Sequence, residues 1–325
     1  MSDTVGIYDL DREDLATALA GEPGWRVDQL WQGLYRDLSP LGEITTLPAA
    51  MRDALGRTHP ESLVASHRKE SDRGTTVKFL WNLTDGLHPI ETVLMHYRDR
   101  STVCVSTQAG CAMACGFCAT GQAGFTRHLT TGEIVEQVVR AARVAAETNR
   151  RVDNVVLMGM GEPLANEPEV HRAVTRIHSA LGISARSITV STVGIVPGIR
   201  RMAEWDLPVN LAVSVHAGRD ELRDELVPIN RRYPLAELIE ACRDYLAVKR
   251  RRVTFEWALI DSVNDTDRDA RELAALTRAL RPAAHVNLIP LNPTPGWPTV
   301  GSPPARVTAF RDKVAVANPR YLSGD

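Results

Sequence analysis

The sequence has no long hydrophobic run, and no stretch approaches the ~20 consecutive apolar residues that span a bilayer. The first residues, Met-Ser-Asp-Thr-Val-Gly, lack a basic segment followed by an apolar core, so we expect no secretory signal. Cysteines are few, five in 325 residues, and three of them are clustered, which argues against a disulfide scaffold and for a reducing compartment. We therefore expect a cytoplasmic protein without membrane contact.

The chain also has little net charge. Its value of −2 at pH 7 neither favours nor excludes a nucleic-acid partner, because basic side chains can gather on one face of a balanced molecule. Hydrophobic residues make up 44% and charged residues 24%, which is typical of a soluble globular protein. A length of 325 residues suits one large domain or a large and a small one, and no internal repeat or low-complexity segment is present.

Hydrophobic periodicity divides the chain into four parts. Residues 1–70 predict a small N-terminal helical module of an RNA-binding type, and residues 71–100 a β-hairpin extension that turns at Asp85-Gly86. Residues 101–304 alternate between strand and helix, and residues 305–325 form a last helix and a tail. After a strand at 102–106, further strands are expected at 155–160, 188–191, 209–215, 253–260 and 286–291.

Six strands in βα order indicate a parallel sheet with right-handed crossovers. Six units are fewer than the eight of a closed barrel. The predicted fold class is therefore α/β, a partial (β/α)6 barrel with the helical module and the hairpin added before it.

Three thiols occupy a short stretch, Cys111-Ala112-Met113-Ala114-Cys115-Gly116-Phe117-Cys118. An iron–sulfur cube has four corners to fill, so three cysteines leave one iron open for a further ligand. A structural zinc site normally takes four protein ligands, and Cys104 or His128 could supply the fourth. A third possibility is that the thiols are unrelated structural residues. The CxxxCxxC spacing resembles the signature of radical S-adenosylmethionine (SAM) enzymes, in which SAM chelates the open iron.

Polar and small residues follow the predicted strands at their carboxyl ends, where barrels of this kind carry function. The strand at 155–160 ends in Gly159-Met160-Gly161-Glu162-Pro163, in which glycine permits close approach of a ligand and Glu162 offers a carboxylate to an ammonium group. Ser191, Ser214 and Asn292 end three later strands. We expect these residues to line one ligand site together with the cysteine loop.

Five longer stretches extend this pattern: Cys104-Val105-Ser106 through Cys118-Ala119-Thr120-Gly121, Met158-Gly159-Met160-Gly161-Glu162-Pro163-Leu164, Val190-Ser191-Thr192-Val193-Gly194, Ser214-Val215-His216-Ala217 and Leu288-Ile289-Pro290-Leu291-Asn292-Pro293. With them the chain resembles the RlmN family of radical SAM RNA methyltransferases over about residues 5 to 315. CxxxCxxC by itself marks only the superfamily, whereas these stretches in this order are much more specific.

This resemblance implies a set of site residues. Cys111, Cys115 and Cys118 would bind a [4Fe–4S] cluster, Glu91 would accept a proton, and Cys104 would be a second functional cysteine that acts on the RNA adduct. The positions that match the SAM-binding residues of the family are Gly161, Glu162, Ser191, Ser214, Val215, His216 and Asn292.

The resemblance also implies a reaction. C2 of adenine is electron-poor and carries an unactivated hydrogen, so the methyl group of one SAM first passes to a C-terminal cysteine. A second SAM, reduced by the cluster, gives a 5′-deoxyadenosyl radical that takes hydrogen from that methyl group. The carbon radical adds to C2, a base removes the ring proton, and a thiolate releases the product and leaves a disulfide bond.

The implied partners are 23S ribosomal RNA, transfer RNA and an electron donor such as flavodoxin, and we expect a monomer. RNA is expected on the side of the strand ends, between the helical module and the barrel. The basic residues that suggest this interface are Arg98, Arg100, Arg127, His128, Arg231 and Arg232.

The C-terminal tail departs from the family pattern. The methyl-carrying cysteine belongs to a stretch of the type Ala-Cys-Gly-Gln-Leu, whereas no cysteine follows Cys242 here, and Cys242 lies on an apolar helix stripe typical of a core thiol. We therefore expect the chain as written to bind its cluster and cleave SAM without methylating C2. The alternatives are a radical SAM enzyme of the same build without methyl transfer and a non-catalytic RNA-binding or zinc protein.

Overall fold

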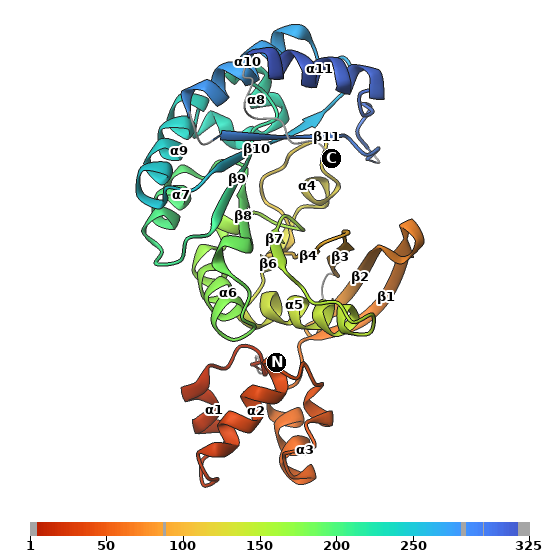
Figure 1. Cartoon of the computed structure of the whole chain (residues 1–325), viewed down its shortest axis with the longest axis vertical. Helices are drawn as coiled ribbons and strands as arrows, with labels where there is room; N and C mark the ends of the chain where they lie inside the picture. Colours follow the sequence, from red (N-terminus) through yellow and green to blue (C-terminus); the bar gives the residue numbers. More distant parts are fainter. Residues whose placement is uncertain (1–4, 87–88, 281–283, 295, 318–325) are drawn as a thin grey trace. The chain divides into compact units, whose positions relative to one another are not determined.

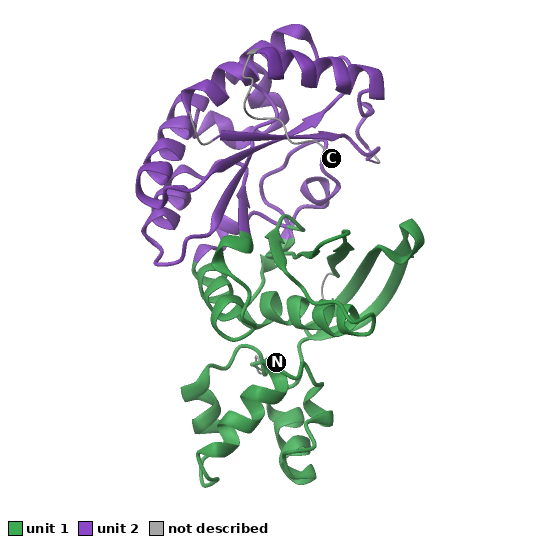
Figure 2. Cartoon of the chain, in the orientation of Figure 1, with its two compact units in different colours: residues 1–109, 126–160, 168–188 green, residues 110–125, 161–167, 189–325 purple. Residues whose placement is uncertain are grey.

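The computed structural model describes residues 5–86, 89–280, 284–294 and 296–317. The chain divides into two compact units, which are coloured separately in Figure 2. Unit 1 contains residues 1–109, 126–160 and 168–188, and unit 2 contains residues 110–125, 161–167 and 189–325. Each unit is described by itself.

Unit 1 begins with the predicted helices, α1 (Arg12–Ala18), α2 (Trp25–Tyr35) and α3 (Ala49–Thr58). The predicted hairpin follows as β2 (Thr76–Leu83) and β3 (Ile90–His96), which pair antiparallel. Residues 63–70, which the sequence analysis placed in the helical module, instead belong to β1 (Leu63–Ser71), antiparallel to β2. The hairpin is therefore part of a larger antiparallel arrangement.

The sheet of unit 1 continues with β4 (Ser101–Cys104), antiparallel to β3, and β7 (Asn154–Leu157), parallel to β4. Helix α5 (Thr131–Ala146) begins with the predicted capping box, in which the Thr130 side chain and the Glu133 side chain each accept from the other's backbone N–H. Its apolar face is buried, and α6 (Glu167–Ser179) follows β7. The strand-to-helix alternation of the prediction begins here.

Unit 2 contains four strands that neighbour one another in the order β8 (Ile188–Thr192), β9 (Asn210–Ser214), β10 (Val253–Leu259) and β11 (Ala284–Pro290). Each pairing between them is parallel. The helices of this unit are α4 (Ala119–Ala123), α7 (Val196–Glu204), α8 (Asp220–Leu226), α9 (Leu235–Lys249), α10 (Asp267–Ala279) and α11 (Pro304–Ala317).

Remaining short elements are strands β5 (Gln108–Gly110) and β6 (Phe125–His128), which pair with each other, and five 3-10 turns. The turns are η1 (Leu41–Glu43), η2 (Asp72–Gly74), η3 (Pro163–Ala165), η4 (Ala185–Ser187) and η5 (Pro228–Arg231).

The strands of unit 2 have one apolar and one polar face. On one face Val190, Leu211, Val213, Phe255 and Trp257 are fully buried, and in Figure 1 α7, α9, α10 and α11 lie on one side of the strands while α4 lies on the other. The opposite face carries the alternate residues, which include Ser191, Ser214, Glu256 and Asn287. The core therefore lies under the helices, and a polar surface is left on the other face.

The predicted fold class is confirmed. The six strands expected in βα order all exist, β4 and β7 in unit 1 and β8 to β11 in unit 2, with bounds close to those predicted. Helices follow these strands as expected, with α8 and α4 as additions that the sequence analysis did not predict.

Candidate functional site

The cysteine loop in unit 2 is closed at its base by the backbone. The N–H of Cys111 donates to the carbonyl of Gly124 at 2.8 Å, and the N–H of Cys118 donates to the carbonyl of Cys115 at 3.1 Å. Gly121 passes so close to the loop that a Cβ on it would lie 2.8 Å from the Cys115 carbonyl oxygen. The stretch is therefore a tight turn that begins and ends in backbone hydrogen bonds.

The three thiols of the loop lie close enough to influence one another. Burial raises the pKa of Cys111 to about 11 and that of Cys115 to about 12, and in both cases the charge of Cys118 adds to the rise. Among the described residues, no three His, Cys, Asp or Glu side chains already surround a common metal position. Three neighbouring sulfur donors on one short loop suit an iron–sulfur cluster that leaves one iron open.

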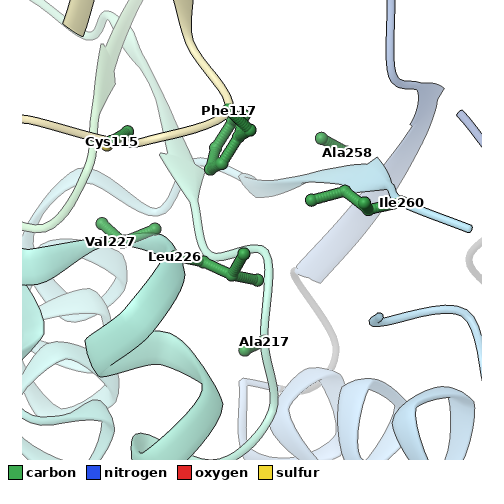
Figure 3. Close-up of a cluster of buried hydrophobic side chains, with 7 residues drawn as sticks. All are labelled: Cys115, Phe117, Ala217, Leu226, Val227, Ala258 and Ile260. Carbon is green, nitrogen blue, oxygen red and sulfur yellow. The ribbon is translucent and has the colours of Figure 1, made fainter. Parts of the chain in front are cut away.

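The loop is anchored on the hydrophobic core by Phe117 and Cys115. Both side chains are buried, and they cluster with residues from the ends of three other segments: Ala217, Leu226, Val227, Ala258 and Ile260 (Figure 3). The ring of Phe117 also meets the ring of His216 edge-on at 5.0 Å between centroids. The position of the thiols therefore depends on the packing that ends β9, β10 and α8.

The segment after β11 also contacts the cysteine loop. The hydroxyl of Thr294 donates to the Phe117 carbonyl at 3.0 Å. The ring of Trp297 lies against Gly116, where an added Cβ would come within 2.2 Å of ring carbon Cζ3. The sequence signal for these contacts was weak, since it consisted of an aromatic residue in a Pro/Gly-rich segment.

Glu162 is buried at 2% exposure and organises the first strand end. Its two carboxylate oxygens accept from the N–H of Leu164 at 3.0 Å and from the N–H of Val193 at 2.8 Å. Burial raises the pKa of Glu162 to about 7, although these hydrogen bonds act in the opposite direction. The preceding Gly161 has a φ of 104°, a left-handed conformation that glycine adopts without strain.

His216, the third residue of Ser214-Val215-His216, is held as a neutral ring. Its Nδ1 accepts from the N–H of Ala258 at 2.9 Å, so the neutral ring carries its proton on Nε2. Burial lowers the pKa of His216 to about 3, and the charge of Arg223 adds to this effect. The sequence analysis missed its main support, Asn264, whose buried amide donates to the carbonyls of His216 and Ala258, both at 2.8 Å.

The remaining predicted SAM contacts lie on or beside the polar face of the sheet in unit 2. Ser191 and Ser214 belong to this face, Val215 is fully buried, and Asn292 is exposed just after β11. Ser214 is in register with Glu256, and Glu256 with Asn287. The sequence analysis missed this pair, in which the amide of Asn287 donates to Glu256 at 2.7 Å. The sequence signal for this pair was a polar residue at an alternate position in each of two apolar strands.

Glu91 and Cys104, the predicted catalytic residues, lie in unit 1 on neighbouring strands. Val93 of β3 is opposite Cys104 of β4, so Glu91, two residues along β3, faces the same side of the sheet. Burial raises the pKa of Cys104 to about 11, and the charge of Glu91 raises it further. Lys78 of β2 pairs with the Glu91 carboxylate at 2.5 Å. The structure thus brings these two residues together.

None of the five cysteines takes part in a disulfide bond, because all five are free thiols. Cys242 is fully buried in α9, as expected of a core thiol, and burial raises its pKa to about 12. His128, weighed as a zinc ligand, has Nδ1 within 3.0 Å of the Gln108 side-chain amide.

The structure changes the expectation for several of the basic residues proposed for RNA binding. Arg98 and Arg100 are exposed but precede Ser101, so they lie at the opposite end of β4 from Cys104 and not at the carboxyl end. Arg127 forms ion pairs with Asp85 at 2.5 Å and Glu133 at 2.7 Å and is therefore a structural residue. Arg231 and Arg232 are exposed at the end of η5, on the connection that follows β9 and α8.

Known proteins share the fold and much of the sequence of this chain. Residues 105–274 match the Radical SAM superfamily. A radical SAM methyltransferase from Sphaerobacter thermophilus has a crystal structure that aligns with a TM-score of 0.92 at 47% identity, over 97% of this chain and 93% of that one. The maturase HydG aligns with a TM-score of 0.52 at 12% identity, over 67% of this chain and 49% of that one, and shows a likeness of fold alone. Fold and site define a radical SAM protein.

Curated relatives narrow this assignment. The probable dual-specificity RNA methyltransferase RlmN of Chloroflexus aurantiacus is 48% identical over 320 residues, which cover 94% of this chain and 85% of that protein. RlmN 1 of Myxococcus xanthus is 48% identical over 97% of this chain and 89% of that protein, and the Mycobacterium marinum protein 51% over 91% and 84%. The chain therefore belongs to the RlmN family of radical SAM RNA methyltransferases.

The family resemblance inferred from the sequence motifs is thus confirmed, and the comparisons do not favour either alternative. The expectation about the tail concerns residues that include 318–325, which lie outside the described part of the chain. Among the described helices, none is both long enough and apolar enough to cross a membrane.

Proposed function

We propose that this protein is a radical SAM methyltransferase that methylates C2 of adenine in 23S ribosomal RNA and in transfer RNA. The observation that carries the proposal is the convergence, within unit 2, of the cysteine loop with the ends of β8 and β9 through Glu162, His216 and Phe117. Names of relatives about 50% identical, all RNA methyltransferases, support the substrate class.

In this proposal Cys111, Cys115 and Cys118 would hold a [4Fe–4S] cluster. When bound, the cluster would supply the electron for reductive cleavage of SAM. Glu162 attracts the SAM ammonium, and Gly161 lets the ligand approach the backbone. Ser191, Ser214, Val215, His216 and Asn292 complete the SAM contacts. The edge-on contact between Phe117 and His216 fixes the loop beside one of these proposed SAM contacts.

Glu91 and Cys104 perform the later proton and thiol chemistry. Lys78 orients the Glu91 carboxylate through their ion pair, and a carboxylate in a fixed position can accept a proton. Cys104 is mostly a neutral thiol at pH 7, because its pKa is raised to about 11. It would therefore need to lose its proton during turnover, and the transient disulfide bond of the family mechanism would form only then.

The proposal extends to the surroundings of the enzyme. We infer a cytoplasmic monomer that receives electrons from a small donor such as flavodoxin. Five free cysteines agree with a reducing compartment.

The product test is mass spectrometry of 23S ribosomal RNA fragments and transfer RNA after incubation with reduced enzyme and SAM. The chain as written and the chain extended by an Ala-Cys-Gly-Gln-Leu type segment are assayed in parallel. Appearance of 2-methyladenosine with the chain as written supports the proposal and contradicts the expectation about the tail. Product with the extended form alone supports the assigned reaction for the rest of the site and agrees with that expectation. No product from either form, with intact SAM cleavage, would contradict methyl transfer to RNA.

Cluster assembly gives an independent test. Cys115→Ala should abolish the broad visible absorption of the reconstituted protein and SAM cleavage with it, because a ligand and the buried anchor of the loop are both lost. Cys104→Ala is the matched control and should keep the full iron and sulfide content. Equal loss of iron in the control would make Cys104 a ligand and favour a four-thiol site.

A further inference from the structure

Arg223 of α8 is a fully buried arginine at the centre of unit 2. Its Nε donates to the Val215 carbonyl at 3.0 Å. Its Nη2 donates to the Val193 carbonyl at 2.6 Å and to the Ser214 carbonyl at 3.3 Å. The guanidinium therefore spans the segments that end β8 and β9, which are the segments that carry the proposed SAM contacts.

The backbone N–H and the backbone carbonyl of Val193 are both hydrogen-bonded in this arrangement. Its N–H donates to Glu162 and its carbonyl accepts from Arg223. Gly194, next in the chain, has a φ of 110°, and a Cβ there would lie 3.3 Å from Nη2 of Arg223. Glu162, Val193 and Arg223 thus form one connected network across the strand ends.

The positive charge of Arg223 is not neutralised by a direct partner. No ion pair joins it to an acidic side chain among the described residues, and its Nη1 donates instead to Asn230 at 2.8 Å. Asp220 and Asp224 accept from the other end of the Asn230 amide, at 3.0 Å and 2.7 Å. The hydrogen bonds from these carboxylates therefore reach the guanidinium through a neutral side chain.

A buried charge of this kind is costly unless it does something that an apolar side chain could not do. The helix that carries Arg223 ends in Leu226 and Val227, which pack in the same cluster as Cys115 and Phe117. Arg223 precedes Leu226 by about one helical turn, so its buried positive charge lies close to the side chains that pack against the cysteine loop.

We propose that Arg223 is a positioning residue with two effects: it fixes the ends of β8 and β9 for SAM, and it favours the reduced, more negative state of the bound cluster. This inference rests on the proposed function, because it assumes that the cysteine loop holds an iron–sulfur cluster. The guanidinium fork supplies the geometry, and its fixed charge supplies the electrostatic effect.

Two variants separate these effects. Arg223→Met removes both charge and donors, so we expect SAM affinity to fall at least tenfold. The ratio of reduced to oxidised cluster at a fixed potential should also fall about tenfold, which corresponds to 59 mV for one electron. Arg223→Lys keeps the charge but not the fork, so SAM affinity should fall while the potential stays near that of the unsubstituted protein.

Arg219, the N-cap residue of the same helix, offers a matched control. It is partly exposed and already paired with Asp269 at 2.6 Å and Glu272 at 2.9 Å, so Arg219→Met should change neither SAM affinity nor potential. Calorimetry with SAM and redox titration by electron paramagnetic resonance are the measurements, after circular dichroism has shown that the variants fold.

The proposal would be overturned by a folded Arg223→Met protein with the SAM affinity and potential of the unsubstituted chain. A potential lowered equally in the Lys and Met variants would overturn the electrostatic part, and an Arg223→Lys protein that still binds SAM normally would overturn the positioning part. If the unsubstituted protein assembled no cluster or bound no SAM, the proposed function itself would fail, and this outcome is distinct from the others.

Discussion

Burial fixes the charge state of the single residues that we place around SAM. His216 remains neutral over the physiological range, because its pKa is lowered to about 3 and its Nδ1 is occupied by a backbone donor. Glu162 is different, since its pKa is raised to about 7 and its protonation changes within the working range. A single carboxyl group should therefore set the pH dependence of SAM binding.

We predict that SAM affinity falls as pH is lowered through 7. Below its pKa the Glu162 carboxyl group is protonated and no longer attracts an ammonium, so each further unit of acidification should weaken binding up to about tenfold. Calorimetry of SAM binding between pH 5.5 and 8.5 measures this dependence. Glu162→Gln is the control, and it should bind weakly with a flat profile. A steep profile in that variant would assign the titration to another group.

At the scale of elements, the cysteine loop depends on a close approach between Gly116 and Trp297. An added Cβ would lie 2.2 Å from the indole ring, so either the ring or the loop must move. The indole lies on the segment that also donates from Thr294 to the loop. Changes in the segment after β11 should therefore reach the thiols.

We predict that Gly116→Ala lowers iron and sulfide incorporation during reconstitution, because the displaced loop no longer presents its three thiols together. Trp297→Leu in the same chain should restore incorporation in part, since it removes the colliding ring, and the two changes should be strongly non-additive. Gly56→Ala is the control, because nothing lies within 4 Å of an added Cβ there. Normal iron and sulfide content in the Gly116→Ala variant would contradict this prediction, because it would show that the Trp297 ring moves aside without displacing the loop.

At the scale of the whole molecule, the question is which surface meets RNA. Parallel strands present function at their carboxyl ends, and Arg231 and Arg232 lie exposed on the connection that follows β9. Arg98 and Arg100 are equally exposed but lie at the amino end of β4. These two pairs make a matched comparison of the same residue type in different places.

We predict that neutralising Arg231 and Arg232 together weakens RNA binding and flattens its salt dependence. Each lost phosphate contact should reduce the slope of log affinity against log salt by about 0.7 to 0.9. The loss of both contacts should make binding roughly 30-fold weaker at 0.1 M salt. Neutralising Arg98 and Arg100 should leave both quantities unchanged. Filter binding across a salt series provides the measurement, and the opposite pattern would move the interface to the amino end of β4.

The sequence by itself determined the fold class and indicated a candidate site. Strand and helix periods are local properties, so the six βα strands were predictable within a few residues. The CxxxCxxC spacing and the polar residues after the strands are equally local, so they indicated which residues to consider together for one site.

Only the tertiary structure decided what supports that site. Arg223, Asn264, Thr294 and Trp297 lie far along the chain from the residues that they hold, and nothing in their local sequence distinguishes them from surface or core residues. The sequence likewise did not determine the end of β4 on which Arg98 lies or the partners of Arg127. Nor did it determine the charge states of Glu162 and His216. Burial and long-range hydrogen bonds set these properties, and both arise only when distant segments pack together.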